Sequence, residues 1–401
     1  MSHKRRVLFF AEAVTLAHVA RPFVLASALD PAAHEICIAW DPRFRRLFSN
    51  YDFALRDLYS IPGERFARLL AEGRPIYCLG TLRRYVRDEL RLIEEFEPDV
   101  VVGDFRLSLA VSAAVAKVPY VTITNAYWSP YARQSFPVPE LPVTRLAGPR
   151  LAQALFDLVR PLAFAHHSRP LSRLRREYGL PGFGGDLRRA YTEADYTLYA
   201  DIPGLIPLAP LPPNHRLLGP VLWSPAVPRP RWWSALPAEG PVVYATLGSS
   251  GAVHLLPRIL AALAGLPVTG MIATAGRARL PDPPRNVFVA EYLPGDEAVA
   301  RACIVICNGG SPATQQALCA GRPVIGLPSN LDQFLSMQAV ARSGAGILLR
   351  PHKMTSGALA AAIRQLIDDS RFTRAAGELG QRCGAGGAVV RFAELIGQLP
   401  R

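Results

Sequence analysis

Short, uninterrupted runs of hydrophobic residues recur along the first half of the chain, and segments with a helical hydrophobic period separate them. Runs of this length are typical of strands that are buried on both faces, as in a parallel sheet covered by helices. The alternation therefore predicts an α/β fold. The predicted strands are Val7–Ala11, Glu35–Trp40, Pro98–Asp104 and Pro119–Thr124, and the predicted helices are about Val19–Leu29 and Ser108–Lys117.

The same pattern starts again after a proline-rich segment, residues 203–241, which we interpret as a semi-rigid linker with little regular structure. The chain thus divides into an N-terminal Rossmann-like domain (1–202), the linker, a C-terminal Rossmann-like domain (242–385) and a last helix (386–401). The strands predicted after the linker are Val242–Leu247, Val268–Ala273, Val287–Val289, Ile304–Cys307 and Val324–Leu327.

Composition agrees with a globular protein of two to three domains, because 50% of the 401 residues are hydrophobic and 19% are charged. The net charge of +13 comes almost entirely from arginine and is spread along the chain without a basic tail. Nucleic acid is therefore not an expected partner. Coding bias, an anionic substrate and loose contact with an acidic membrane surface remain as explanations of the charge.

The N-terminal hydrophobic run ends early, at Glu12, which predicts a first strand and not a signal peptide. No run reaches the roughly 18 apolar residues of a membrane span. None of the six cysteines forms a C-x-x-C pair, and we expect buried, reduced thiols. Together these features predict a cytoplasmic protein. The cysteines are Cys37, Cys78, Cys303, Cys307, Cys319 and Cys383.

The segment from Cys307 to Gln333 carries the strongest candidate chemistry. A predicted strand stops at Gly309 and Gly310, and Ser311 and Pro312 follow as a suitable N-cap and first helical residue. A helix N-terminus behind glycines offers free backbone N–H groups and the positive end of the helix dipole, which together bind phosphate. The segment could equally be an ordinary strand-to-helix turn.

This segment, C-N-G-G-S-P-A-T-Q-Q-A-L followed by G-R-P and D-Q, resembles the donor-binding signature of family-1 glycosyltransferases. It departs from the signature at Asn308, Pro312, Ala313 and Gln316, so the resemblance implies an altered site with a weaker or shifted nucleotide preference, or lost binding. Asn308 is expected to donate to a phosphate and Gln316 to bind a ribose hydroxyl. The resemblance implies diphosphate binding at Gly309, Gly310 and Ser311, and sugar binding at Asp332 and Gln333.

Three further positions complete the donor site that the resemblance implies. Tyr292, in E-Y-L-P, stands where the family has an aromatic residue that stacks on the nucleotide base. Gly248 and Ser249 follow the first strand of the second domain, where the family's loop reaches the phosphates. A packed tyrosine and an ordinary glycine–serine turn are the alternatives.

In the first domain, His18 and Asp104 follow or end predicted strands, where parallel sheets form ligand crevices. The resemblance implies that His18 is the general base and that Asp104 orients it. Here Ala17 replaces the family's glycine, and one extra residue separates His18 from Pro22. An unengaged histidine is the alternative. Two aromatic residues after the next strand, Tyr127 and Trp128, form either an acceptor wall or part of the core.

The resemblance therefore implies the GT-B fold, two Rossmann-like domains facing across a cleft, with the last helix packed back on the N-terminal domain. The expected activity is inverting transfer from a UDP- or dTDP-sugar to a hydroxyl of a small lipophilic natural product or lipid. Neither a metal nor a cofactor is expected. The alternatives are a degenerate homologue that helps a partner enzyme, and a sugar-nucleotide epimerase. No pattern indicates an oligomeric state.

Overall fold

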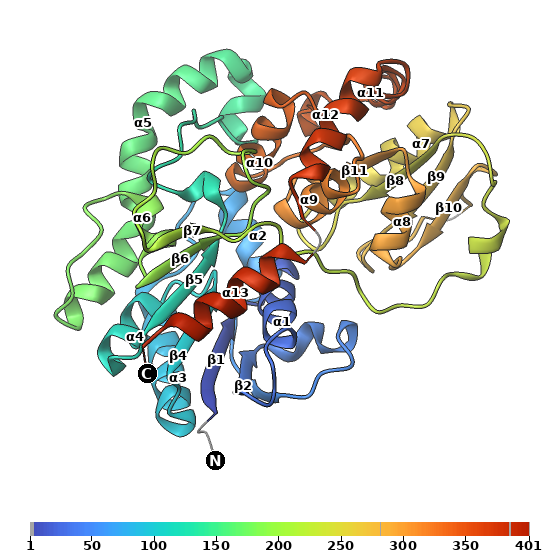
Figure 1. Ribbon diagram of the computed structural model, residues 1–401. Helices are drawn as coiled ribbons and strands as arrows, with labels where there is room; N and C mark the ends of the chain where they lie inside the picture. The colour runs from blue at the N-terminus through green and yellow to red at the C-terminus, as the bar shows by residue number, and fades with distance from the viewer. Residues whose placement is uncertain (1–3, 281, 385, 401) are drawn as a thin grey trace. The chain divides into compact units, whose positions relative to one another are not determined.

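The computed structural model describes residues 4–280, 282–384 and 386–400, and its internal contacts divide the chain into two units (Figure 1). Unit 1 comprises Met1–Gln134, Ala154–Val221 and Ala385–Arg401, and unit 2 comprises Ser135–Gln153 and Leu222–Gly384. Each unit is built on its own sheet. The domain boundary expected at residue 385 lies outside the described residues.

The described residues of unit 1 form a seven-stranded parallel sheet in the order β3-β2-β1-β4-β5-β6-β7. Its central strands are continuously apolar, as predicted, because helices cover both of their faces. The strands are β1 (Arg5–Ala11), β2 (His34–Trp40), β3 (Ala54–Asp57), β4 (Val100–Asp104), β5 (Tyr120–Thr124), β6 (Tyr196–Tyr199) and β7 (His215–Leu217).

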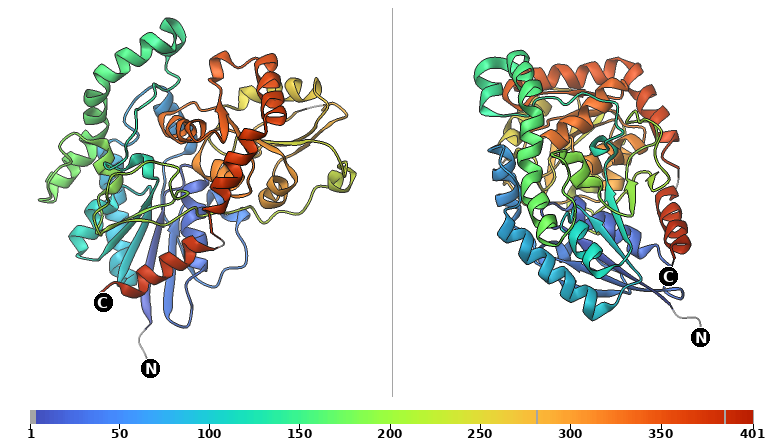
Figure 2. Two further views of the ribbon diagram at one scale, coloured as in Figure 1. Left: turned by 45° about the horizontal axis from the view of Figure 1, so that its top comes forward. Right: turned by 90° about the vertical axis from the view of Figure 1, so that its left-hand side faces the viewer.

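Alternate side chains of β1 enter different layers of unit 1. Leu8 lies in a buried cluster with Leu92 and Leu109 on one face of the sheet, whereas the Phe9 ring contacts Phe392 of the last helix, with 5.9 Å between centroids. Figure 2 shows α3 and α13 on opposite sides of this sheet. The helices of unit 1 are α1 (Ala17–Ser27), α2 (Gly63–Ala71), α3 (Leu79–Phe96), α4 (Leu109–Ala116), α6 (Leu187–Thr192) and α13 (Gly387–Gln398), with 3-10 turns η1 (Pro42–Leu47) and η2 (Ala126–Trp128).

The last helix, α13, is tied to the first strand. The Arg5 guanidinium donates to the backbone carbonyls of Ile396 and Leu399, and Arg391 donates to the carbonyl of Leu218.

The proline-rich segment was predicted to have little regular structure, but its residues 215–217 form β7 at the edge of the unit 1 sheet. An edge position tolerates proline nearby, because one side of the strand makes no ladder hydrogen bonds.

Unit 2 has a second parallel sheet, with its described strands in the order β10-β9-β8-β11-β12-β13. A buried cluster that includes Ile259, Ile306 and Ile363 packs between this sheet and its helices. The elements are β8 (Val242–Thr246), β9 (Thr269–Ala273), β10 (Val287–Ala290), β11 (Ile304–Cys307), β12 (Val324–Gly326), β13 (Gly346–Leu348), α7 (Leu256–Ala264), α8 (Gly295–Arg301), α9 (Ser311–Cys319), α10 (Leu331–Arg342), α11 (Ser356–Asp368), α12 (Ser370–Gln381), η3 (Arg231–Ala235), η4 (Val253–Leu255) and η5 (Pro351–Lys353).

In each sheet, the chain starts near the middle, adds strands on one side and then crosses to the other side. The reversal lies between β1 and β4 in unit 1 and between β8 and β11 in unit 2. The loops after two such strands diverge, which leaves a crevice at their carboxyl ends. This topology determines where each unit can bind a ligand.

A 36-residue helix, α5 (Pro142–Glu177), bends at Gly148, whose φ of 78° is outside the helical range. Its first part belongs to unit 2 with the preceding segment, where Glu140 pairs with Arg350 at 2.9 Å and with His352 at 2.6 Å. The chain therefore enters unit 2 once at residues 135–153, long before it builds the second sheet.

The prediction that all six cysteines are reduced thiols is wrong for one pair. Cys319, at the end of α9, and Cys383, after α12, form a disulfide with 5.6 Å between their Cα atoms. The pairing depends on the packing of α12 against α9, which spacing in the sequence does not reveal. Among the described residues, Cys37, Cys78, Cys303 and Cys307 are free.

Candidate functional site

A histidine and an aspartate meet at the crevice of unit 1. His18 lies in the first turn of α1, directly after β1, and its Nδ1 is 2.8 Å from Oδ1 of Asp104, the last residue of β4. The Asp104 side chain is fully buried, whereas 18% of the His18 side chain is exposed. If Nδ1 donates to the carboxylate, Nε2 carries the lone pair that can accept a proton. The Phe105 ring stacks on the imidazole at 4.5 Å.

Arg21 binds both oxygens of the same carboxylate. Its Nε and one terminal nitrogen donate to Asp104 at 2.7 and 2.8 Å, in a bidentate pair. Burial alone would raise the pKa of Asp104, but Arg21 and the hydrogen bond with His18 outweigh it and lower this pKa. Asp104 is therefore an anion at neutral pH, which is the form that accepts a proton from imidazole and stabilises imidazolium.

This polar network continues along the strand ends beyond Arg21. The second terminal nitrogen of Arg21 donates to Oδ1 of Asn125 at 3.0 Å, and the Asn125 amide donates to Asp201 at 3.0 Å. Asp201 also accepts from the backbone N–H of Ala126 at 2.5 Å. Arg21, Asn125 and Asp201 were not predicted from the sequence, although each lies within a few residues of a strand end or of His18.

Tyr127 and Trp128, the predicted acceptor contacts, form η2 after β5 and are both buried. The Trp128 ring stacks on Tyr191 at 4.5 Å and lies 6.5 Å from the Phe164 ring. These contacts account for core packing, the alternative that the sequence left open. Contact of either aromatic residue with an acceptor stays a prediction.

A second buried cluster joins the loops that follow β1 and β4. Arg106 pairs with Glu12 at 2.7 Å and with Glu89 at 2.6 Å, and the three side chains are fully buried. Burial raises the pKa of both glutamates, although Arg106 opposes the change. Arg106 thus connects Glu12, the residue after β1, to the turn that follows Asp104.

In unit 2, the strand ends at the reversal point are joined through one hydroxyl. Asn308, directly after β11, donates from its amide to Oγ of Ser250 at 3.1 Å, and its carbonyl oxygen accepts from the N–H of Gly310 at 3.0 Å. The side chain of Gln333 reaches the same Oγ at 3.5 Å. The bond to Ser250 links the loops after β11 and β8, and donation from Asn308 to a phosphate stays a prediction.

The geometry of this loop requires a glycine at position 309. Gly309 has a φ of 77°, and a Cβ there would lie 2.5 Å from Cγ of Met337. Gly310 is the N-cap of α9, and Ser311 and Pro312 occupy its first turn. The prediction of Ser311 as the N-cap was therefore wrong by one residue. Ser311 is already the first helical residue, and its hydroxyl accepts from the Gln315 amide at 2.6 Å.

The start of α10 approaches the same loops. Asn330 caps this helix by accepting from the N–H of Gln333, whose side-chain oxygen accepts from the N–H of Ser329 at 2.9 Å. Gln333 is buried, while Asp332 is partly exposed in the first helical turn. Gln333 thus holds the Ser329–Asn330 turn, and contact of Asp332 with a sugar stays a prediction.

The remaining predicted donor residues follow other strands of unit 2. Gly248 and Ser249 lie in the loop after β8, and Gly248 adopts a φ of 58°. Tyr292 follows β10 and donates its hydroxyl to the carbonyl of Ala275 at 3.2 Å. Gln316, on α9, lies against Gly295, where a Cβ would be 3.3 Å from its Oε1.

A cation that the sequence analysis missed stands beside the loop after β8. Arg277 donates to the carbonyl of Gly251 at 2.7 Å and to that of Gly248 at 3.4 Å. Arg277 follows β9 by a few residues, and this position after a strand is the feature of the sequence that could have marked it as a candidate ligand contact. Within the described part of the chain, no three His, Cys, Asp or Glu side chains come together as a metal site would require.

Comparison with known proteins gives these sites a context. Residues 259–387 match the model of the erythromycin biosynthesis protein CIII-like C-terminal domain. A PGL/p-HBAD biosynthesis glycosyltransferase of Mycobacterium tuberculosis is 52% identical over 96% of this chain and 90% of its own length. A PGL/p-HBAD biosynthesis rhamnosyltransferase of Mycobacterium bovis is 52% identical over 96% of this chain and 85% of its own length.

A third relative is named as inactive. This inactive PGL/p-HBAD biosynthesis glycosyltransferase of Mycobacterium bovis is 46% identical over 80% of the chain and 87% of its own length. Among solved structures, the spinosyn rhamnosyltransferase SpnG matches with a TM-score of 0.69 and 23% identity over 98% of this chain and all of that one. The two parallel sheets and these matches establish the GT-B fold, and the chain belongs to the bacterial family-1 glycosyltransferases that include the PGL/p-HBAD biosynthesis enzymes.

Proposed function

We propose that this enzyme transfers a sugar, with inversion and without a metal, from a UDP- or dTDP-sugar to a hydroxyl of a lipophilic acceptor. The observation that carries the proposal is the 2.8 Å contact between His18 Nδ1 and the buried Asp104 carboxylate at the reversal point of the first sheet. The relatives support sugar transfer in general. Inversion at the anomeric carbon, the donor and the acceptor are parts of our proposal.

His18 is the general base of the proposed reaction. Asp104 holds the proton on Nδ1, so Nε2 takes the proton of the acceptor hydroxyl as its oxygen attacks the anomeric carbon. The new carbon–oxygen bond forms on the face opposite the bond to the diphosphate, which breaks with its electron pair leaving on the phosphate oxygen. Asp104 then stabilises the imidazolium, and Arg21 keeps Asp104 ionised.

Unit 2 supplies the donor half of the reaction. The N-terminus of α9 presents backbone N–H groups and the positive end of the helix dipole to the diphosphate. Arg277 adds a positive charge beside the loop after β8. Negative charge that develops on the leaving diphosphate is thereby stabilised by protein groups. Asp332, partly exposed in the first turn of α10, is proposed to accept hydrogen bonds from the sugar hydroxyls.

The names of the relatives suggest which donors and acceptors to test first. One relative at 52% identity is called a rhamnosyltransferase, so rhamnose linked to dTDP or UDP is our first proposed donor. One SpnG structure is described as a complex with thymidine diphosphate, which supports including dTDP. Another is described as a complex with spinosyn aglycone, which supports testing lipophilic acceptors.

The test replaces the proposed base. His18→Ala should reduce transfer to background, while the affinity for UDP or dTDP, measured by calorimetry, should stay within a few-fold because unit 2 binds the nucleotide. His34→Ala is the matched control, because this imidazole lies at the start of β2, with its Nδ1 3.0 Å from the Asp30 carbonyl, and its loss should not affect transfer. Near-normal turnover in His18→Ala would show that His18 is not the base.

A helper protein without transferase activity is the second candidate. It is favoured by the relative named as inactive and by Asn308, whose amide donates to Ser250 and so links two loops of the protein. Titration of the unmodified protein with UDP and dTDP separates the two candidates. Saturable binding of either nucleotide supports the transferase, and absence of binding to both supports the helper.

A further inference from the structure

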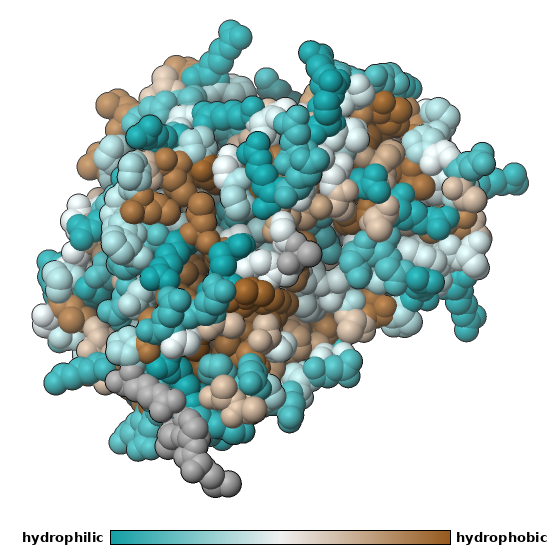
Figure 3. Space-filling view, viewed as in Figure 1, coloured by the Kyte–Doolittle hydropathy of each residue, from teal (hydrophilic) through white to brown (hydrophobic). Residues whose placement is uncertain are grey.

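The outer face of α5 carries a row of exposed leucines. Leu155, Leu158 and Leu162 are spaced by three and four residues, so they lie on one face of the helix. Their exposed fractions are 46%, 76% and 73%. Leu151, which is 64% exposed, precedes them by one turn of the same helix. Figure 3 shows hydrophobic residues along the outer edge over α5. A row of this kind is unusual on a protein surface.

Farther along α5, the same face becomes basic. Arg169, Arg173 and Arg176 continue the helical spacing that begins at Leu155, and all three are exposed. The whole helix has seven arginines against one aspartate and one glutamate. The opposite face is buried from Phe164 onward, so the helix is held against unit 1 while the leucine–arginine face stays outside. We call this face, Leu155 to Arg176, the α5 outer face.

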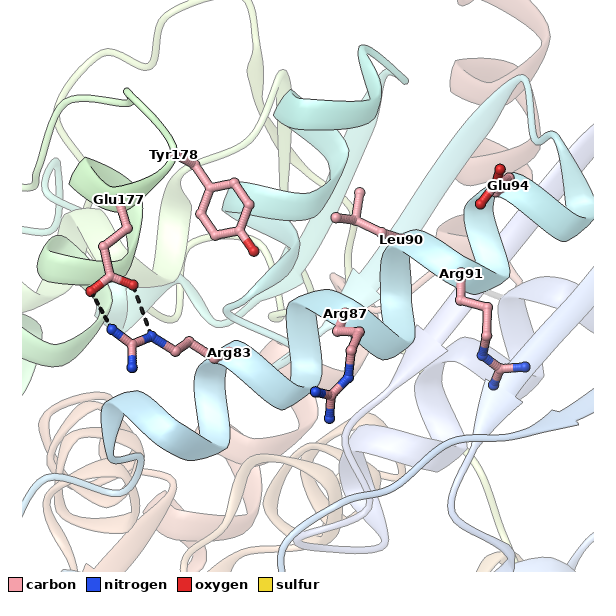
Figure 4. A pocket seen from close by; sticks show the side chains of 7 residues that line it. All are labelled: Arg83, Arg87, Leu90, Arg91, Glu94, Glu177 and Tyr178. Carbon is pink, nitrogen blue, oxygen red and sulfur yellow. Dashed lines mark hydrogen bonds and ion pairs between the residues drawn. The ribbon is translucent and has the colours of Figure 1, made fainter.

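A basic hollow adjoins the arginine end of the α5 outer face. It has a volume of about 670 Å³, and its lining carries three arginines and two glutamates: Arg83, Arg87, Leu90, Arg91 and Glu94 of α3, together with Glu177 and Tyr178 (Figure 4). Arg83 donates twice to Glu177, at 2.9 and 2.8 Å. Glu177 also lies 3.7 Å from a side-chain nitrogen of Arg173, so the hollow and the arginine row are continuous.

We propose that the α5 outer face docks on an anionic lipid bilayer. The leucines enter the boundary between headgroups and acyl chains, and the arginines, with those of the hollow, contact lipid phosphates. Charge complementarity favours this partner, because the protein carries +13 and its arginines gather where the leucines end. The inference goes beyond the proposed function and does not depend on it.

A second copy of the chain fits this face less well. Parallel pairing of two outer faces would bring arginines against arginines, and full antiparallel overlap would set leucines against arginines. Both arrangements bury charge without a partner of opposite sign. A bilayer provides an apolar layer and negative phosphates at the same time, so it meets both halves of the face.

The experiment measures binding of the full chain to vesicles by flotation. One vesicle is phosphatidylcholine alone, and the other also contains phosphatidylglycerol. We expect binding to the second, weakened by added salt. The double variant Leu158→Ser and Leu162→Ser should bind at least tenfold more weakly, without a change of charge. Val390→Ser is the matched control, because Val390 is an exposed aliphatic residue of unit 1 on α13, 54% exposed.

Three results would overturn the proposal: no binding to either vesicle, equal binding by the double variant, or equal loss of binding in Val390→Ser. Dimerisation in sedimentation velocity that disappears in the double variant, without vesicle binding, would assign the face to a second copy instead. All variants should keep the thermal unfolding midpoint of the original protein, because the replaced side chains are exposed.

Discussion

Replacement of Asp104 by asparagine tests the polar network of unit 1 most directly. The change keeps the shape of the side chain but removes its charge and one of its two acceptor oxygens. Asp104 accepts two bonds from Arg21, at 2.7 and 2.8 Å, and one from His18 at 2.8 Å. Asparagine cannot accept all three, because its amide nitrogen is a donor.

Two separate losses are expected from Asp104→Asn. Arg21 is only 5% exposed and would lose its charged partner, which typically costs about 3–5 kcal/mol in the free energy of unfolding. We expect about 3 kcal/mol, since Asn125 and Asp201 still face the guanidinium. Transfer should fall by about 10²–10⁴-fold, or roughly 3–5 kcal/mol of barrier, because the imidazole loses its orienting anion.

Urea unfolding and initial rates of nucleotide release measure these two losses. The matched control is Asp201→Asn, in which another buried aspartate of the same network loses its charge, but whose bonds go to Asn125 and to the N–H of Ala126. It should lose stability with a much smaller effect on transfer. Transfer within threefold of the original in Asp104→Asn, with stability lost, would refute an orienting role and leave Asp104 as the anchor of Arg21.

Three further predictions concern the donor site, the disulfide and acid. Asp332→Ala should raise KM for the sugar nucleotide and leave the affinity for the bare nucleotide unchanged; equal losses of both in kinetics and calorimetry would make Asp332 structural. Cys383→Ser opens a loop with a sequence separation of 64 and should lower the free energy of unfolding by about 4 kcal/mol, whereas an unchanged urea midpoint would count against the Cys319–Cys383 bond. Because the pKa of Asp104 is lowered on folding, its contribution to stability is complete above the ordinary aspartate pKa of about 3.9 and declines as the pH falls below it. The stability difference between the original protein and Asp104→Asn should therefore shrink in acid, and a constant difference would contradict this reasoning.

The α/β fold could be predicted from the sequence because the central strands are buried on both faces. Apolar runs predicted strands at Pro98–Asp104 and Ile304–Cys307, and the structure has strands at Val100–Asp104 and Ile304–Cys307. Strands with weaker patterns were missed. β3, an edge strand, has mostly exposed side chains, and β7 lies in the proline-rich segment. The exposed side chains of β3 form no apolar run, since only part of the surface of this edge strand is covered.

The candidate site was predictable only in part. His18 and Asp104 could be named because each stands next to a strand and matches a familiar pattern, and the structure joins them at 2.8 Å. Arg21 lies one turn after His18 in a predicted helix, and a charged residue on an otherwise apolar face was an overlooked signal. Asn125 and Asp201 are 76 residues apart, so only the pairing of β5 and β6 brings them together.

The two units are interleaved along the chain, and this has a consequence for synthesis on the ribosome. Residues 135–153 emerge early but belong to unit 2, while the last residues, in α13, complete unit 1. Until α13 emerges, Phe9 on the sheet lacks the cover that Phe392 provides, and Arg5 lacks the carbonyls of Ile396 and Leu399. Unit 1 is thus the first to begin folding and the last to finish. A chain that stops short of α13 would leave the ribosome with an open apolar face, the kind of surface that chaperones bind and that leads to aggregation.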